Sequence, residues 1–98
     1  MLFNPDSDAS VLDHVEVRFA GFASWAGIGL GDADVSITNT TVRDCLVDGL
    51  DLSSNTEGAL VSGCSFLDNG AVAVDNVPLS AVPGFSGNSA SGNGSVTT

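Results

Sequence analysis

The sequence predicts an all-β solenoid, a parallel β-helix of about four short coils. Three observations support this fold class. The chain repeats itself at a step of 24 or 25 residues. Within each repeat, apolar residues alternate with polar ones at the spacing of two that is typical of strands. No window keeps a 3.6-residue period, and Gly, Asn, Asp and Ser interrupt the chain every few residues, which excludes helical repeats.

Equivalent positions of the repeats fall into columns. The first strand region contributes the columns Leu12, Ile37, Val61, Phe85 and Val17, Val42, Phe66, Ala90. Between and after them lie Val15, Thr40, Cys64, Asn88 and the turn column Ala20, Cys45, Asn69, Asn93. In the second strand, the spacing predicts the columns Ile28, Leu50, Val72, Val96 and Leu30, Leu52, Val74, Thr98. We expect the members of each column to stack about 4.8 Å apart on successive coils.

The chain resembles a known superfamily in three phrases: SVLDHVEVRFAG, VSITNTTVRDCLVDGLDL and ALVSGCSFLDNGAVAV. They are similar to right-handed parallel β-helix repeats of the pectate-lyase-like superfamily, over residues 9–98. The resemblance implies a right-handed solenoid. It implies no single activity, because the superfamily includes polysaccharide lyases, hydrolases, epimerases, adhesins and surface modules. The superfamily often carries asparagine in the turn column, where this chain has Asn69 and Asn93, so we expect a ladder of two rungs.

The chain is short enough for a single domain over residues 1–98, with a polar leader at 1–9 and repeats over 10–98. In the leader, Leu2 and Phe3 are expected to add a partial strand before the first coil. The first coil is predicted to contain Val11–Val17, a long turn at Phe19–Ala26 and a second strand at Gly27–Leu30.

The next two coils are predicted at Asp34–Val42 with Leu50–Leu52, and at Ala59–Phe66 with Ala71–Val74. The segment Asp75–Gly84 is expected to bulge outward, because Pro78 and Pro83 cannot donate to a central ladder. Phe85–Thr98 is rich in Gly, Ser and Asn, which predicts the weakest coil.

The chain is strongly acidic, with a net charge of −10 from twelve acids and two basic residues, Arg18 and Arg43. Nucleic acid and anionic membranes are not expected as partners, because both need clustered basic side chains. No apolar run is long enough to span a membrane, and Met1–Ser10 lacks the features of a signal peptide. The protein is therefore either cytoplasmic or part of a longer extracellular or cell-surface protein, and the resemblance favours the second.

Cys45 and Cys64 are predicted to be free, buried thiols. They fall on different coils and out of register, so a disulfide between them is disfavoured by distance.

Asp44, Asp48 and Asp51 come closest to an acidic cluster. The resemblance implies that lyases on this scaffold hold Ca²⁺ with such acids and that hydrolases use two or three carboxylates. The spacing here matches no calcium loop, and strand alternation would send these acids to different faces. We therefore predict a solvated acidic surface and no cofactor, with a Ca²⁺ site as the alternative.

Arg18 and Arg43 share a column on adjacent coils, where Glu16 and Asp44 are close enough in sequence to counter them. The arginine pair is a candidate for binding an acidic sugar, against the more common interpretation as surface ion pairs. His14 is the only histidine, and without a placed partner it is weak evidence for catalysis.

The turn of the first coil carries an aromatic insertion, Phe19, Phe22 and Trp25. Phe22 and Trp25 are candidates for a platform that stacks on sugar rings. The alternative is a hydrophobic cap or an interface.

Together these features favour a non-catalytic structural or carbohydrate-associated β-helix module of a surface or secreted protein. The alternative is a carbohydrate-active enzyme, a polysaccharide lyase or glycoside hydrolase, or a fragment of one. An enzyme needs convergent acids, or acids with a base, on one outer face, whereas a module needs none. The end coils of a solenoid present unpaired backbone groups, so we also predict a homodimer or another homo-oligomer.

Overall fold

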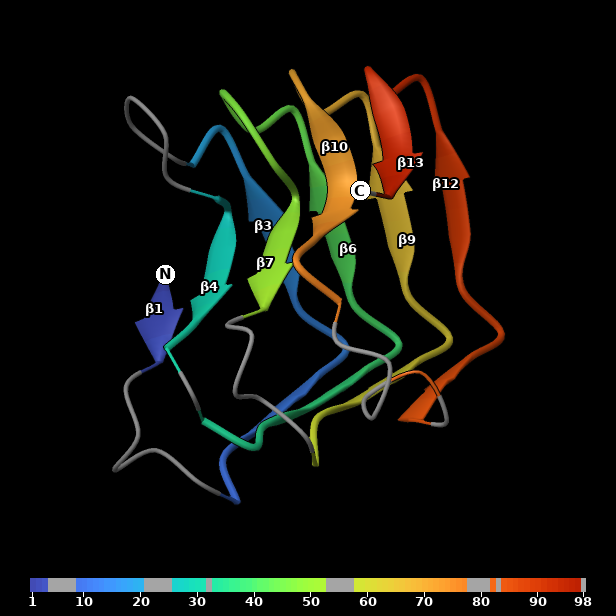
Figure 1. Ribbon diagram of the computed structural model, residues 1–98. Coiled ribbons are helices and arrows are strands. Elements are labelled where there is room, and N and C mark those ends of the chain that lie inside the picture. The colour runs from blue at the N-terminus through green and yellow to red at the C-terminus, as the bar shows by residue number, and fades with distance from the viewer. Residues whose placement is uncertain are drawn as a thin grey trace.

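The computed structural model describes residues 1–3, 9–20, 26–31, 33–52, 58–77, 82 and 84–97. They form an all-β, right-handed parallel β-helix whose short strands stack into three parallel sheets (Figure 1). This confirms the predicted fold class. The described residues contain no helix that is long and apolar enough to cross a membrane.

Each coil passes through three sheets, named here B, C and A in the order in which the chain meets them. Sheet B contains β2 (Val11–Asp13), β5 (Ser36–Thr38), β8 (Leu60–Ser62) and β11 (Phe85–Ser86). Sheet C contains β3 (Glu16–Arg18), β6 (Thr41–Arg43), β9 (Ser65–Leu67) and β12 (Ser89–Ser91). Sheet A contains β1 (Leu2–Phe3), β4 (Ile28–Leu30), β7 (Leu50–Leu52), β10 (Val72–Asp75) and β13 (Ser95–Thr97).

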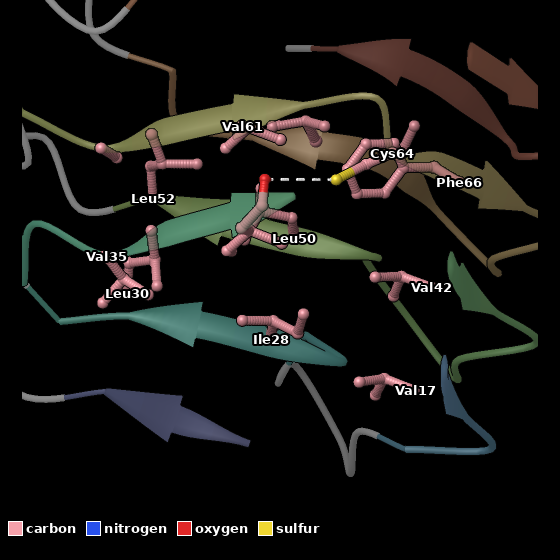
Figure 2. Close-up of a cluster of buried hydrophobic side chains, with 14 of the residues drawn as sticks. Val17, Ile28, Leu30, Val35, Val42, Leu50, Leu52, Val61, Cys64 and Phe66 are labelled. Carbon is pink, nitrogen blue, oxygen red and sulfur yellow. Dashed lines mark hydrogen bonds between the residues drawn. The ribbon is translucent and has the colours of Figure 1, made fainter. Parts of the chain in front are cut away.

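The core lies between the three sheets, and strand alternation supplies its side chains (Figure 2). In β5 and β6, for example, the central residues Ile37 and Val42 are buried and their neighbours are partly exposed. In β7 the pattern is reversed, so that Leu50 and Leu52 are buried while Asp51 is not. These patterns place one apolar column in sheet B, one in sheet C and two in sheet A.

The columns predicted for sheets B and C are confirmed. Parallel pairing joins Leu12, Ile37, Val61 and Phe85 in sheet B. It joins Val17, Val42, Phe66 and Ala90 in sheet C. The partial strand predicted at Leu2 and Phe3 is also present, as β1, which pairs with β4 and starts sheet A.

The register predicted for sheet A is wrong from the third coil onward. Ile28 pairs with Leu50 and Leu30 with Leu52 as expected, but Leu50 then pairs with Val74 and not with Val72. Val72 pairs with Ser95 rather than Val96, and Val74 pairs with Thr97 rather than Thr98.

The cause lies in the turn before β10. The amide N–H groups of Gly70 and Ala71 donate to the carbonyls of Cys45 and Val47. This turn therefore stacks directly on the corresponding turn of coil two. Leu50 and Val74 are therefore 24 residues apart, as are Cys45 and Asn69. The turns of coils two and three therefore have the same length, and Val72 is only half-buried.

Two corners of every coil turn through residues with left-handed backbone. Between sheets B and C these residues are His14, Asn39, Gly63 and Gly87, with φ from 48° to 64°. After sheet C they are Phe19, Asp44, Asp68 and Gly92, with φ from 53° to 73°. Gly, Asn and Asp tolerate this conformation best. Because the same positions turn in each coil, the strands between them remain in register.

Candidate functional site

An asparagine ladder runs along the turn column after sheet C. The Cys45 N–H donates to Asn69 Oδ1 at 3.1 Å, and the Asn69 N–H donates to Asn93 Oδ1 at 2.9 Å. The Asn69 amide nitrogen also donates to the Val42 carbonyl at 3.2 Å, and only 2% of Asn69 is exposed. The two predicted rungs are therefore present, and each supplies an acceptor to the preceding coil.

A second ladder at the corner between sheets B and C was not predicted. The Val15 N–H donates to Thr40 Oγ1 at 3.4 Å, and the Cys64 N–H donates to Asn88 Oδ1 at 2.9 Å. Asn88 also donates from its side-chain nitrogen to the Val61 carbonyl at 2.9 Å. Thr40 and Asn88 are polar members of an otherwise apolar column. That contrast in the sequence could have predicted this second ladder.

Each cysteine occupies a ladder position that asparagine holds in another coil. Both are free and buried, as predicted. The amides of Ala20 and Thr40 donate to the thiols of Cys45 and Cys64, respectively. The Cys64 thiol in turn donates to the Ile37 carbonyl at 3.4 Å (Figure 2). Burial raises the pKa of both thiols, so they are structural groups and not activated nucleophiles.

Four aspartates accept hydrogen bonds from the following coil. The donors and distances are Thr38 Oγ1 to Asp13 at 2.7 Å, Gly58 N–H to Asp34 at 2.9 Å, Val72 N–H to Asp48 at 3.0 Å and Asn76 Nδ2 to Asp51 at 2.8 Å. We call this set the inter-coil aspartates. Each joins residues 24 or 25 positions apart, so each ties one coil to the next.

The acidic cluster predicted from the sequence is divided in the structure. Asp44 lies at the left-handed corner and forms an ion pair with Arg43, at 2.8 Å. Asp48 interacts instead with the carboxylates of Asp75 and Asp51, which face each other on paired strands. In the part of the chain that the structure describes, no group of three or more His, Cys, Asp or Glu side chains could hold a metal ion.

The prediction of a solvated acidic surface is wrong for Asp48, of which only 6% is exposed. Burial raises the pKa of its carboxyl group, and the negative charges of Asp75 and Asp51 raise it further. The Val72 N–H opposes this effect by stabilising the carboxylate. Asp48 is buried because its oxygen reaches inward to the next coil, where that N–H needs an acceptor.

Arg18 and Arg43 are paired in register, as the column predicts. Arg18 binds Glu16 at 3.1 Å and Arg43 binds Asp44 at 2.8 Å, which confirms the predicted counter-charges. The Arg18 guanidinium also lies 4.8 Å from the ring centre of Phe19, which is 70% exposed. Phe22 and Trp25, the candidate sugar platform, lie outside the described residues.

His14 and Asp13 form part of an exposed polar corner on the first coil. The pKa of Asp13 is lowered from 3.8 to about 2, mainly by the Thr38 hydroxyl and then by Asn39 and His14. His14 Nδ1 lies 2.9 Å from the carboxylate. The histidine therefore has a structural partner here, and the corner holds the first two coils together.

Acid should weaken this corner. Because the folded pKa of Asp13 lies below its ordinary value of 3.8, its stabilising effect is complete above that pH and is lost as the pH falls through about 2. We expect the thermal midpoint to fall more steeply between these pH values in the parent protein than in Asp13→Asn. Parallel midpoint curves for the two proteins would contradict this assignment.

No protein-family model, curated protein or solved structure matches this chain. The resemblance to the pectate-lyase-like superfamily therefore stays a prediction from the residue pattern.

Proposed function

We propose that this protein is a non-catalytic β-helix module of a surface or secreted protein, of the pectate-lyase-like kind, that provides a rigid scaffold and associates with carbohydrate. The observation that carries this proposal is the bonding of the inter-coil aspartates. Each of these four carboxylates accepts a hydrogen bond from the following coil. Acids committed in this way stabilise the stack, whereas a hydrolase or lyase needs acids directed at a substrate.

The carbohydrate association is supported by the outer face of sheet C. Arg18 and Arg43 are paired there, and the exposed Phe19 ring lies beside the Arg18 guanidinium at the corner that follows. Arginine binds carboxylates through paired N–H donors, and aromatic faces stack on sugar rings. The ligand class that fits this pair is an acidic sugar, such as a uronate.

One observation favours the alternative, a carbohydrate-active enzyme. Asp48 has a raised pKa and lies near Asp51 and Asp75, and such environments are common for general acids. However, Asp48 is almost fully buried and its Oδ1 already accepts the Val72 N–H. A substrate would have to displace a contact that joins two coils, so we favour the structural role.

Stability and turnover of Asp48→Asn test the two functions. In a structural role, the amide keeps an oxygen for the Val72 N–H and removes a buried charge, so the thermal midpoint at pH 7 should rise. The gain should shrink in acid, because a raised folded pKa means that the parent carboxyl is already protonated there. Turnover of polygalacturonate or a neutral polysaccharide by the parent protein, with or without Ca²⁺, and its loss in Asp48→Asn would establish the enzyme instead.

Binding can be tested with oligogalacturonate by calorimetry. We expect Arg43→Gln to weaken binding at least tenfold, because the pair would lose one cation. Thr41→Ser, a conservative change on the same strand, is the control and should bind normally. Equal affinity in Arg43→Gln and the parent protein would rule out this face as the uronate site.

A further inference from the structure

The chain contains two copies of the acceptor motif for N-linked glycosylation, Asn-X-Ser/Thr. They are Asn39-Thr40-Thr41 and Asn93-Gly94-Ser95. The motif is short, so the environment of the asparagine decides whether the folded protein can accept a sugar there. The two asparagines differ in that environment, because Asn39 is exposed at a corner whereas Asn93 is a rung of the asparagine ladder.

The side-chain amide of Asn93 is occupied by bonds within the stack. Its nitrogen donates to the Phe66 carbonyl at 2.8 Å and to the Ser91 carbonyl at 3.3 Å. Its oxygen accepts the backbone N–H of Asn69 at 2.9 Å and the Asn69 side-chain nitrogen at 2.8 Å. A sugar on this nitrogen would replace one of its two N–H groups and break a bond to the backbone. Asn93 is therefore a structural residue in the folded protein.

The side-chain amide of Asn39 lies on the surface. Asn39 is exposed and turns the chain between sheets B and C with a φ of 48°. Its side-chain nitrogen donates to Asp13 Oδ1 at 3.1 Å, between two exposed groups. This bond uses one of the two N–H groups of the amide. The other N–H can be replaced by a sugar while Asp13 keeps its partner.

The neighbouring coils leave room for a sugar at this corner. The equivalent residues of the next two coils are Gly63 and Gly87, and both are exposed. A methyl group on Gly63 would lie 2.9 Å from Asn39 Oδ1, so the glycine keeps the amide uncovered. Thr41, which supplies the hydroxyl of the motif, is partly exposed on β6, next to the inward-facing Val42. Both recognition groups of this motif are therefore at the surface.

We propose that Asn39 is an N-glycosylation site of the folded protein and that Asn93 is not. The donor is a glycosyl diphosphate, a sugar joined through its anomeric carbon to a lipid or nucleotide diphosphate. Asn39 Nδ2 forms a bond to the anomeric carbon as the bond from that carbon to the diphosphate oxygen breaks. The diphosphate leaves with the electron pair, and the amide releases one proton to a base of the transferase.

This inference rests on the surface or secreted location in the proposed function, because the motif marks acceptor sites on surface loops of secreted proteins. It does not depend on the proposed binding of a uronate. The unglycosylated protein is used to measure oligogalacturonate binding, so failure of either proposal leaves a distinct result for the other.

A soluble N-glycosyltransferase with UDP-glucose as donor tests the purified, folded protein, with mass spectrometry as the readout. We expect the parent protein to gain one hexose, at Asn39. Asn39→Gln and Thr41→Ala should gain none, whereas Thr41→Ser keeps the hydroxyl and should retain the site. Thr41→Ala leaves the Asn39 side chain intact, so it decides if Asn39→Gln fails to fold.

An unfolded chain is the control for the effect of structure. In Leu50→Asp, which places a carboxylate at a fully buried position, Asn93 should also gain a hexose once circular dichroism shows that the chain is unfolded. Secretion from a eukaryotic cell supplies the lipid-linked donor. Modification there, or only with UDP-glucose, distinguishes the two donor sources. A folded parent protein that gains no hexose at Asn39, or gains one at Asn93, would overturn the proposal.

Discussion

Leu50→Asp should unfold the protein at pH 7. Leu50 is fully buried in sheet A, between Ile28 and Val74 on the neighbouring strands. A buried carboxylate without a partner costs several kcal/mol, and a whole domain is stable by only about 5–15 kcal/mol. A four-coil solenoid lies toward the lower end of that range, since a short chain buries little surface. Far-ultraviolet circular dichroism with a thermal melt measures the outcome.

Leu46→Asp is the matched control. Leu46 lies four residues earlier in the same coil but is 61% exposed, so its substitution should change stability by about 0.5 kcal/mol or less. The corrected register adds a second comparison, because Val74→Asp should then be far more damaging than Val72→Asp. A soluble Leu50→Asp variant that melts cooperatively near the parent midpoint would contradict the column assignment.

Asn69→Leu should cost about 3 kcal/mol, although leucine has a similar shape and would fit an apolar core. Asn69 accepts the Cys45 N–H and donates to the Val42 carbonyl, and it is almost fully buried. Leucine would leave both backbone groups without these partners, and an unsatisfied buried group costs about 1–3 kcal/mol. Urea denaturation, compared at constant slope, measures the difference.

The control is Asn93→Leu, one coil further along the same ladder. Asn93 is only half-buried, so water can replace part of what its side chain supplies, and we expect a loss of about 1 kcal/mol. Equal costs at the two positions, or a neutral Asn69→Leu, would show that the ladder contributes little to stability.

Much of the fold could be predicted because two kinds of information agree in sheets B and C. There, strand alternation and the repeat step select one alignment, as with Ile37 and Val61. In the third coil of sheet A, Val72 and Val74 are both apolar and two residues apart, so the pattern fits either register. The choice is made by the backbone bonds of Gly70 and Ala71, which composition does not encode.

The site was less predictable, because a residue type does not reveal its partner. Asp48 has the composition of a surface residue, and its acceptor role becomes visible only when Val72 is known to lie beside it. The thiols of Cys45 and Cys64 suggest ordinary apolar core, yet they occupy positions that asparagine holds in other coils. Both cases depend on register, which fixes the contacts between residues about one coil apart.

Amide hydrogen exchange tests the central claim, that polar side chains join each coil to the next. The informative amides are those of Cys45, Cys64 and Val72: the first two donate to a side chain of the following coil, and Val72 donates to Asp48 of the preceding coil. If these bonds persist in solution, the three amides exchange only through opening of the stack, with protection close to that of the core strands. Exchange of all three at the rate of an unstructured peptide would contradict the claim.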